Sequence, residues 1–318
     1  MQEKFKSALA LALFSSAAWI LGTHLIGPRP RGYAANLQKN GGETCAAAKS
    51  EDLPYRLPEI ARDLKILQAL PASGRPIHRF IHKHNITSCF KKAYSRKNEA
   101  GNYLNGRILV YANADSKTSF HEYFHAQQDK IIADADIESL DRRDRFLIRM
   151  FAEAAATAYS LVVAQEAENS GIVLRPKTME KNSAGFLKFT TAADNPDLKR
   201  SFDRIYRLAR ETQHTERSAL ALAGQQAVRF MMQGNIEQWV HSYAEKAFNH
   251  TAGGDTRQRR QTFSDRDRVF RSLGHVSADI NLTPPEMLGA HGEQTLQTMA
   301  ETLNNMRKAQ TVDVALTR

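Results

Sequence analysis

The chain has 318 residues, of which 42% are hydrophobic and 8% aromatic, enough apolar material for one sizeable core or two modest ones. Its 44 Lys and Arg against 34 Asp and Glu give a formal charge of +10, which favours encounters with anionic surfaces. The densest basic run, residues 257–271, is interrupted by Asp265 and Asp267 and has no nucleic-acid-binding motif beside it. We therefore interpret it as a solvated helix face and do not expect a nucleic-acid partner.

Residues 1–27 have the composition of a targeting segment. Lys4 and Lys6 precede a long uncharged stretch, and the compact apolar run 8–14 is followed by small residues, as in a cleaved signal peptide. The apolar character continues to Ile26, so the segment is also long enough to be an uncleaved membrane anchor, the reading we favour. In both cases the chain is expected to be exported. It would either stay anchored in the inner membrane and face the periplasm, or be periplasmic or secreted after cleavage of the signal.

Residues 28–52 are rich in Gly, Ala, Asn and Lys without apolar periodicity, which predicts a linker and an ordered domain beginning near Leu53. The chain has only two cysteines, Cys45 and Cys89. In an oxidising compartment they can pair, although two unpaired cysteines fit the sequence equally well. Neither lies in a C-x-x-C arrangement.

The rest of the chain predicts an α+β fold in which helices predominate. Apolar spacing of three and four predicts a helix over 58–70, and β-prone runs at 87–94 and 103–112 predict strands separated by a turn at 97–102. Further helices are predicted over 116–133, 142–168, 196–212, 216–233, 236–247, 264–273 and 293–308. The irregular stretch 174–195 suggests a boundary between a metallopeptidase-like domain, 53–190, and a helical C-terminal part, 191–318.

The predicted helix 116–133 contains a complete H-E-x-x-H motif, His121-Glu122-Tyr123-Phe124-His125. Its start is expected to be capped within 116–119. His121 and His125 are four residues apart and so share one helix face, where both imidazoles can reach one metal ion, and zinc suits them best. Glu122 is rotated from His121 by about 100° and would lie beside the metal, placed to take a proton from water as general base.

At this point the sequence resembles the zincin superfamily of zinc metallopeptidases. The metzincin branch is excluded because Gln128 and Ile131 stand where that branch has a glycine and a third histidine. The remaining match is gluzincin-like, and the segment from Phe120 to Gln128 also resembles uncharacterised bacterial putative metallopeptidases. The resemblance implies a small sheet packed on a pair of active-site helices, with His121 and His125 as zinc ligands.

The gluzincin resemblance implies a glutamate on a later helix as third ligand, and Glu153 is our candidate. It lies 28 residues after His125, far enough for one helix to end and another to return beside it. Its neighbours are alanine-rich, so two helices can approach closely. Glu166 is about 20 Å further along the same helix and faces elsewhere, and Asp129 is placed awkwardly for joint coordination.

The resemblance fails at one position that orients a ligand. Thermolysin-like enzymes have an aspartate four residues after the glutamate ligand, and Thr157 stands there in this chain. Asp134, Asp136 or a backbone carbonyl is expected to take over this role.

Several other polar residues could in principle take part in catalysis. We interpret His78, His82 and His84 as an exposed basic surface, because Arg and Lys residues lie nearby and no acid does. His241, Tyr243 and His275 are possible oxyanion-stabilising residues, but each is better explained as structural, and Tyr159 as packing.

The motif therefore predicts a zinc peptidase acting on a peptide or protein, tethered to the membrane by its N-terminal segment. The alternative is a membrane-tethered scaffold or binding protein that kept the fold without turnover. A third hypothesis takes the positive charge and the helical C-terminal part as a polyanion-binding module attached to the enzyme. The complete motif argues for the enzyme, because a structural metal site does not need Glu122.

Overall fold

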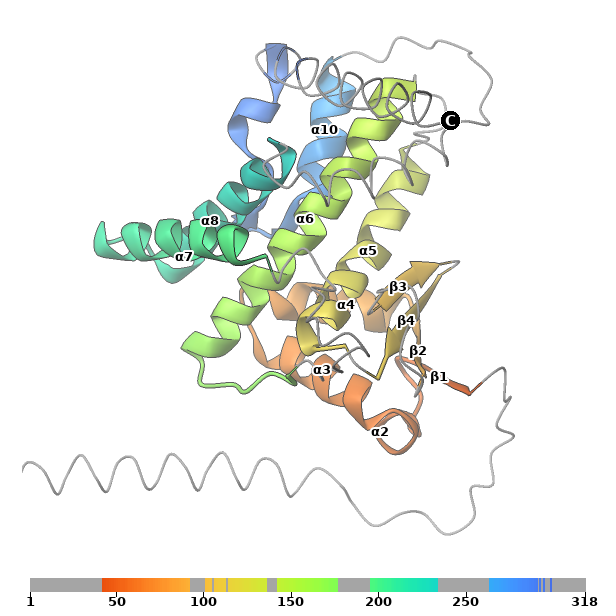
Figure 1. The fold of residues 1–318 in the computed structure, drawn as a ribbon. Coiled ribbons are helices and arrows are strands. Elements are labelled where there is room, and N and C mark those ends of the chain that lie inside the picture. Colours follow the sequence, from red (N-terminus) through yellow and green to blue (C-terminus); the bar gives the residue numbers. More distant parts are fainter. Residues whose placement is uncertain are drawn as a thin grey trace, which may run out of the picture.

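The computed structural model describes residues 42–91, 101–104, 106–112, 114–135, 142–176, 195–233 and 263–290, with isolated positions at 292, 294 and 298. The predicted targeting segment, the predicted helix 236–247 and most of the predicted helix 293–308 lie outside these residues. The described chain is α+β and mainly helical, which confirms the predicted fold class (Figure 1).

A four-stranded mixed sheet lies at one end of the molecule (Figure 1). Its strands, in spatial order, are β1 (Glu43–Ala47), β2 (Thr87–Lys91), β4 (Arg107–Tyr111) and β3 (Gly101–Leu104). The central pair, β2 and β4, is parallel, and both outer pairs are antiparallel. Among the described residues, β1 and β3 therefore form the two edges.

Strand β1 lies inside the segment predicted as a linker, so the prediction that order begins near Leu53 is wrong. Cys45 of β1 lies opposite Cys89 of β2, and the two form a disulfide across a separation of 44 residues. The pairing that the sequence allowed is therefore present in the structure. Because the partner strand is so far along the chain, the composition of residues 28–52 alone could not indicate β1.

The run 103–112, expected to be extended throughout, is part of a hairpin. Strand β3 ends at Leu104 and antiparallel β4 begins at Arg107, so only two residues connect them. Gly106 in this connection has a φ of +73°, a conformation that glycine adopts readily. Strand β3 also begins within the predicted turn 97–102, at Gly101, because pairing with β4 extends it.

Helices make up the remainder of the described fold, and their bounds agree closely with the predicted helices where both exist. They are α2 (Leu53–Arg56), α3 (Pro58–Ala69), α4 (Gly74–Lys83), α5 (Ser116–Asp134), α6 (Arg142–Asn169), α7 (Pro196–Glu211), α8 (Glu216–Met232) and α10 (Phe263–Leu273). A small hairpin, β5 (His275–Ser277) with β6 (Ile280–Asn281), and a 3₁₀ turn at Pro285–Met287 follow α10. Helices α2 and α4 were not predicted.

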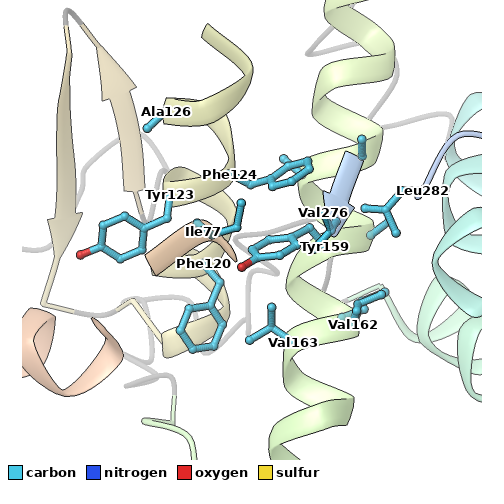
Figure 2. Packing of buried hydrophobic residues seen from close by; sticks show 14 of the residues in the cluster. Ile77, Phe120, Tyr123, Phe124, Ala126, Tyr159, Val162, Val163, Val276 and Leu282 are labelled. Carbon is cyan, nitrogen blue, oxygen red and sulfur yellow. The ribbon is translucent and has the colours of Figure 1, made fainter. Parts of the chain in front are cut away.

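Helix α6 is the centre of the fold, since α5, α8 and α10 all pack against it (Figure 1). Phe124 of α5 stacks on Tyr159 of α6 with ring centroids 4.5 Å apart (Figure 2). Among the described residues, the segment Leu147–Asn169 is the one long and apolar enough to cross a membrane, and 83% of its apolar window is buried inside the fold. Its apolar surface is thus accounted for by packing in the core.

The hydrophobic core extends across the predicted boundary at 174–195. Phe151 of α6 packs edge-on against Phe270 of α10, with ring centroids 5.0 Å apart. Phe202 of α7 and Leu220 of α8 belong to the same buried cluster. The C-terminal helices therefore share one hydrophobic core with the helix pair that carries the motif and Glu153.

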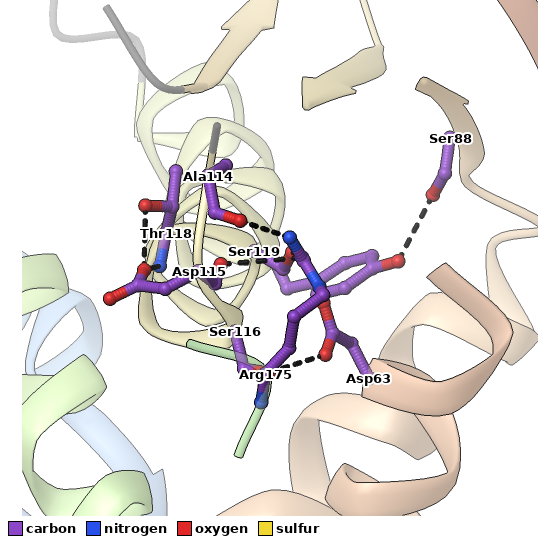
Figure 3. A network of polar contacts seen from close by, with 9 residues as sticks. Asp63, Ser88, Ala114, Asp115, Ser116, Thr118, Ser119 and Arg175 are labelled. Atoms are coloured by element: carbon purple, nitrogen blue, oxygen red, sulfur yellow. Dashed lines mark hydrogen bonds and ion pairs between the residues drawn. The ribbon is translucent and has the colours of Figure 1, made fainter. Parts of the chain in front are cut away.

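A buried polar network fixes the start of α5 (Figure 3). The guanidinium of Arg175 contacts Asp63 of α3 at 2.8 Å and Ser119 of α5 at 3.1 Å, and it also donates to the carbonyl of Ala114. Ser116 donates to the second carboxylate oxygen of Asp63 at 2.6 Å. Because Asp63 has no exposed surface, these groups, rather than water, compensate its charge.

Replacing Arg175 by methionine is expected to lower the free energy of unfolding by about 3 kcal/mol, because Asp63 is left as an unpaired buried charge. Urea denaturation measures the change. Arg204→Met, at an exposed position on α7, is the matched control and should change stability by less than about 0.5 kcal/mol. Equal stabilities of the two variants would show that the buried ion pair is unimportant.

Candidate metal centre

The motif helix α5 begins at Ser116 and is capped by Asp115, so the expectation of a cap within residues 116–119 is wrong by one residue. The Asp115 carboxylate accepts the backbone N–H of Thr118 at 2.8 Å, which satisfies a helix-terminal donor. Phe120 and Phe124 are fully buried in the core. This packing leaves His121 and His125 partly exposed on another face of the helix.

His121, His125 and Glu153 converge on one point. The Nε2 atoms of the two histidines lie 2.9 Å apart, and Glu153 Oε2 lies 3.5 Å from that of His121 and 3.3 Å from that of His125. Their side chains are between 16% and 27% exposed. The structure therefore brings together the three residues that the sequence singled out as metal ligands.

The separations of these three atoms fit a tetrahedral zinc ion. Nitrogen and oxygen ligands about 2.0–2.1 Å from zinc lie about 3.3–3.4 Å from one another in a tetrahedral arrangement. The observed separations of 2.9, 3.3 and 3.5 Å bracket that value. Two imidazoles and one carboxylate are also the donor set of known catalytic zinc sites with an open position.

The pKa values within the cluster reflect its concentration of charge. Burial opposes ionisation of both His125 and Glu153, but their contact outweighs it. Glu153 raises the pKa of His125 to about 9, and the two histidines hold the pKa of Glu153 far below its usual range. A metal ion bound here would replace the proton that His125 and Glu153 hold between them.

Gln128 orients His125, a role that sequence reasoning missed. Its side-chain nitrogen donates to the carbonyls of Ala152 at 3.1 Å and Leu273 at 3.2 Å. The side-chain oxygen of Gln128 therefore faces Nδ1 of His125, 2.9 Å away. Because an amide oxygen can only accept a hydrogen bond, Nδ1 of His125 must be the donor. The lone pair of a neutral His125 is thereby placed on Nε2, toward Glu153.

For His125, Gln128 fills the orienting role that was expected of Asp134, Asp136 or a backbone carbonyl. Asp134 is exposed and pairs with Lys130 four residues earlier on α5. Asp136 lies outside the described residues. Thr157, which stands where thermolysin-like enzymes have the orienting aspartate, is buried. Gln128 takes that role because it lies one turn beyond His125 on the same helix.

Glu122 lies beside the cluster, in contact with strand β3. It is 7% exposed, and burial raises its pKa against the lowering effect of His121 and His125. Glu153 raises this pKa further, while the backbone N–H of Tyr103 donates a hydrogen bond that lowers it. A carboxyl group with a raised pKa next to a metal-ligand cluster is suited to accepting and releasing a proton.

Gly101 allows β3 to approach Glu122 this closely. A Cβ atom at position 101 would lie 2.9 Å from Glu122 Cγ, 3.0 Å from its Oε1 and 2.8 Å from Thr118 Cγ2. These contacts are shorter than van der Waals packing allows. We therefore identify Gly101 as a second position that matters to the site and that sequence reasoning missed.

For the zinc peptidase function proposed below, changing Gly101 to alanine is expected to lower turnover at least about tenfold by displacing Glu122, because misplacing a catalytic group by an ångström has effects of this size. Zinc content should not change, because Glu122 is not among the converging ligands. Peptidase assays run beside metal analysis separate the two effects. Full turnover in the variant would mean that the contact between β3 and Glu122 has no catalytic importance.

Two acidic residues weighed against Glu153 have other partners. Glu166 of α6 accepts the backbone N–H groups of Ala72 and Ser73, each at 2.8 Å, and so binds the start of α4. Asp129 accepts a hydrogen bond from the hydroxyl of Tyr103 at 3.3 Å. Burial, followed by this Asp129 carboxylate, raises the pKa of Tyr103 to about 12. Neither acid belongs to a metal-ligand cluster within the described part of the chain.

The remaining candidates lie away from the cluster or outside the described residues. The rings of His78 and His82 on α4 lie in contact, with centroids 4.3 Å apart and planes tilted by 40°. Both side chains are partly buried, so the prediction of an exposed surface holds only for His84. Burial, and then the charge of His82, lowers the pKa of His78. Tyr159 is buried and donates to the carbonyl of Ser73, which confirms its packing role.

Of the three residues considered for oxyanion stabilisation, only His275 is described, as an exposed residue of β5. His241 and Tyr243 lie outside the described residues. Comparison with known proteins adds no assignment: no family model matches the chain, and neither the curated proteins nor the solved structures include a significant match. The functional argument therefore starts from the geometry of His121, Glu122, His125 and Glu153.

Proposed function

We propose that the chain is a zinc-dependent peptidase in which His121, His125 and Glu153 hold the metal and Glu122 is the general base. The observation that carries this proposal is the convergence of two imidazole nitrogens and one carboxylate oxygen within 4.8 Å of one another. Among the described residues only these three converge there, whereas structural zinc sites have four protein ligands. A three-ligand site leaves a position for water or substrate, as catalysis requires.

The residues around the cluster can carry out the proton transfers of peptide hydrolysis. A bound zinc ion supplies Lewis acidity, which polarises a carbonyl and makes water easier to deprotonate. Glu122 accepts a proton from the attacking water and returns it to the amine that leaves when the C–N bond breaks. Gln128 keeps His125 oriented throughout, because its own amide is fixed by two backbone carbonyls.

The position of β3 supports an extended peptide as the substrate class. Among the described residues β3 is an edge strand, and its backbone at Gly101 and Tyr103 borders Glu122. An edge strand offers backbone hydrogen-bonding groups along which an extended peptide can align. A peptide bound in this way would pass close to the general base.

A proteolysis assay tests this function directly. The full chain is incubated with an unfolded protein substrate such as casein, with and without a chelator, and new amino termini are counted. We expect cleavage that the chelator stops and that added zinc restores. The variant His121→Ala should be inactive under all conditions. Cleavage that persists in the chelator or in the variant would reject the proposal.

We also propose that the domain is exported. The Cys45–Cys89 disulfide supports this location, since such bonds persist mainly in oxidising compartments. An alkaline phosphatase reporter fused after Arg318 should be active in cells, because that enzyme needs an oxidising compartment to fold. A fusion that is produced at full length but has no phosphatase activity in cells would contradict export.

A further inference from the structure

A cavity of about 430 Å³, widely open to solvent and lined by polar residues, lies at the C-terminal end of α10 beside the β5–β6 hairpin. Its lining residues are Asp267, Arg268, Arg271, Ser272, His275 and Asn281. None of them belongs to the candidate metal centre. The cavity combines two arginines and a histidine with a single acidic residue, so its lining is predominantly basic.

The arginines at the end of a helix often have a structural role, because they can bond to its last carbonyl groups. Here other groups already bond to those carbonyls. The carbonyl of Phe270 accepts from Thr283 Oγ1 at 2.8 Å, and that of Arg271 accepts from the Asn281 side chain at 3.0 Å. The carbonyl of Leu273 accepts from Gln128 at 3.2 Å. The end of α10 therefore does not require the Arg271 side chain.

Hydrogen bonds hold two residues of the cavity wall in place, while Arg271 and His275 stay available. The Asp267 carboxylate accepts the backbone N–H of Gly289 at 2.8 Å, and both polar atoms of the Asn281 side chain are hydrogen-bonded. Arg271 and His275 are both exposed. Within the part of the chain that the structure describes, neither of their side chains has a hydrogen bond or an ion pair.

The geometry points to this cavity as a binding site for a small molecule that carries a phosphate group. An arginine guanidinium matches the oxygens of a phosphate with two parallel hydrogen bonds, and His275 and Ser272 add donors on the same cavity wall. The volume lies within the range of about 300–1,000 Å³ typical of small-molecule sites, so the phosphate can carry an organic group. This inference does not depend on the proposed metal chemistry.

The test is calorimetric titration of the full chain with inorganic phosphate and, separately, with glycerol 3-phosphate, at constant ionic strength. We expect saturable binding that weakens at least tenfold in Arg271→Gln. Arg204→Gln is the matched control, because it removes an equally exposed arginine from α7, outside the cavity lining, and its binding should equal that of the wild type.

The two ligands distinguish the sources of the phosphate. Tighter binding of glycerol 3-phosphate would indicate a ligand with an organic group, such as a metabolite or a lipid headgroup, and equal binding would indicate the free anion. Both results support a phosphate site if the ligands bind more weakly to Arg271→Gln than to the wild type. Equal affinities in the wild type and both variants, or no saturable binding of either ligand, would overturn the inference.

Discussion

Replacing Glu122 by glutamine is expected to lower peptide hydrolysis at least about 100-fold and to leave zinc content at the wild-type level. Glutamine has nearly the same shape as glutamate, but its amide cannot accept a proton from water. Zinc should remain because Glu122 is not one of the three converging groups. The fold should also remain, because the glutamine side-chain oxygen can still accept the hydrogen bond from the backbone N–H of Tyr103.

The measurement is the rate of peptide cleavage, made beside zinc analysis and thermal denaturation of the same preparation. Glu168→Gln is the matched control, since it makes the same change at an exposed position on α6. Undiminished turnover in Glu122→Gln would reject Glu122 as the base. Loss of zinc in that variant would show instead that Glu122 is a ligand.

Removing the Glu153 carboxylate is expected to weaken zinc binding at least about 100-fold, because loss of even an outer partner of a ligand costs 10- to 100-fold. The carboxylate oxygen lies 3.3 and 3.5 Å from the two imidazole nitrogens, so Glu153→Ala leaves a site with two ligands. Catalytic activity at limiting zinc should fall in parallel. Competition with a chromogenic chelator measures the affinity.

Glu168→Ala is the matched control for Glu153→Ala, because it removes a carboxylate from an exposed position on the same helix, whereas Glu166 is unsuitable. Glu166 binds the start of α4 through two backbone N–H groups, so its removal is expected to destabilise the fold. Equal zinc affinity in Glu153→Ala and the wild type would reject Glu153 as the third ligand. The histidine pair would then need another acidic partner.

The convergence of His121, His125 and Glu153 could be predicted because its signals are local. His121 and His125 are one turn apart on α5, and Glu153 lies on α6, the next helix in the described chain. Spacing along the chain is therefore enough to bring them together. Helix bounds were predictable for the same reason, since an amphipathic or alanine-rich run indicates its own conformation.

The features that were missed depend on contacts between distant parts of the chain. The amide of Gln128 is fixed in part by the carbonyl of Leu273, 145 residues away, and Arg175 meets Asp63 across 112 residues. Strand β1 exists because it pairs with β2. Gly101 matters only because β3 lies against Glu122. The spacing of Gln128 three residues after His125 was the one signal in the sequence that could have suggested its role.

Metal analysis of the purified full chain tests the central claim most directly. Mass spectrometric metal analysis of the wild type should find about one zinc ion per chain, with the double variant His121→Ala/His125→Ala as the comparison. The account predicts that the double variant has no zinc and no peptidase activity while its thermal denaturation stays cooperative. Equal zinc content in the two proteins, or a wild type that hydrolyses peptides at the full rate after its metal is removed, would contradict it.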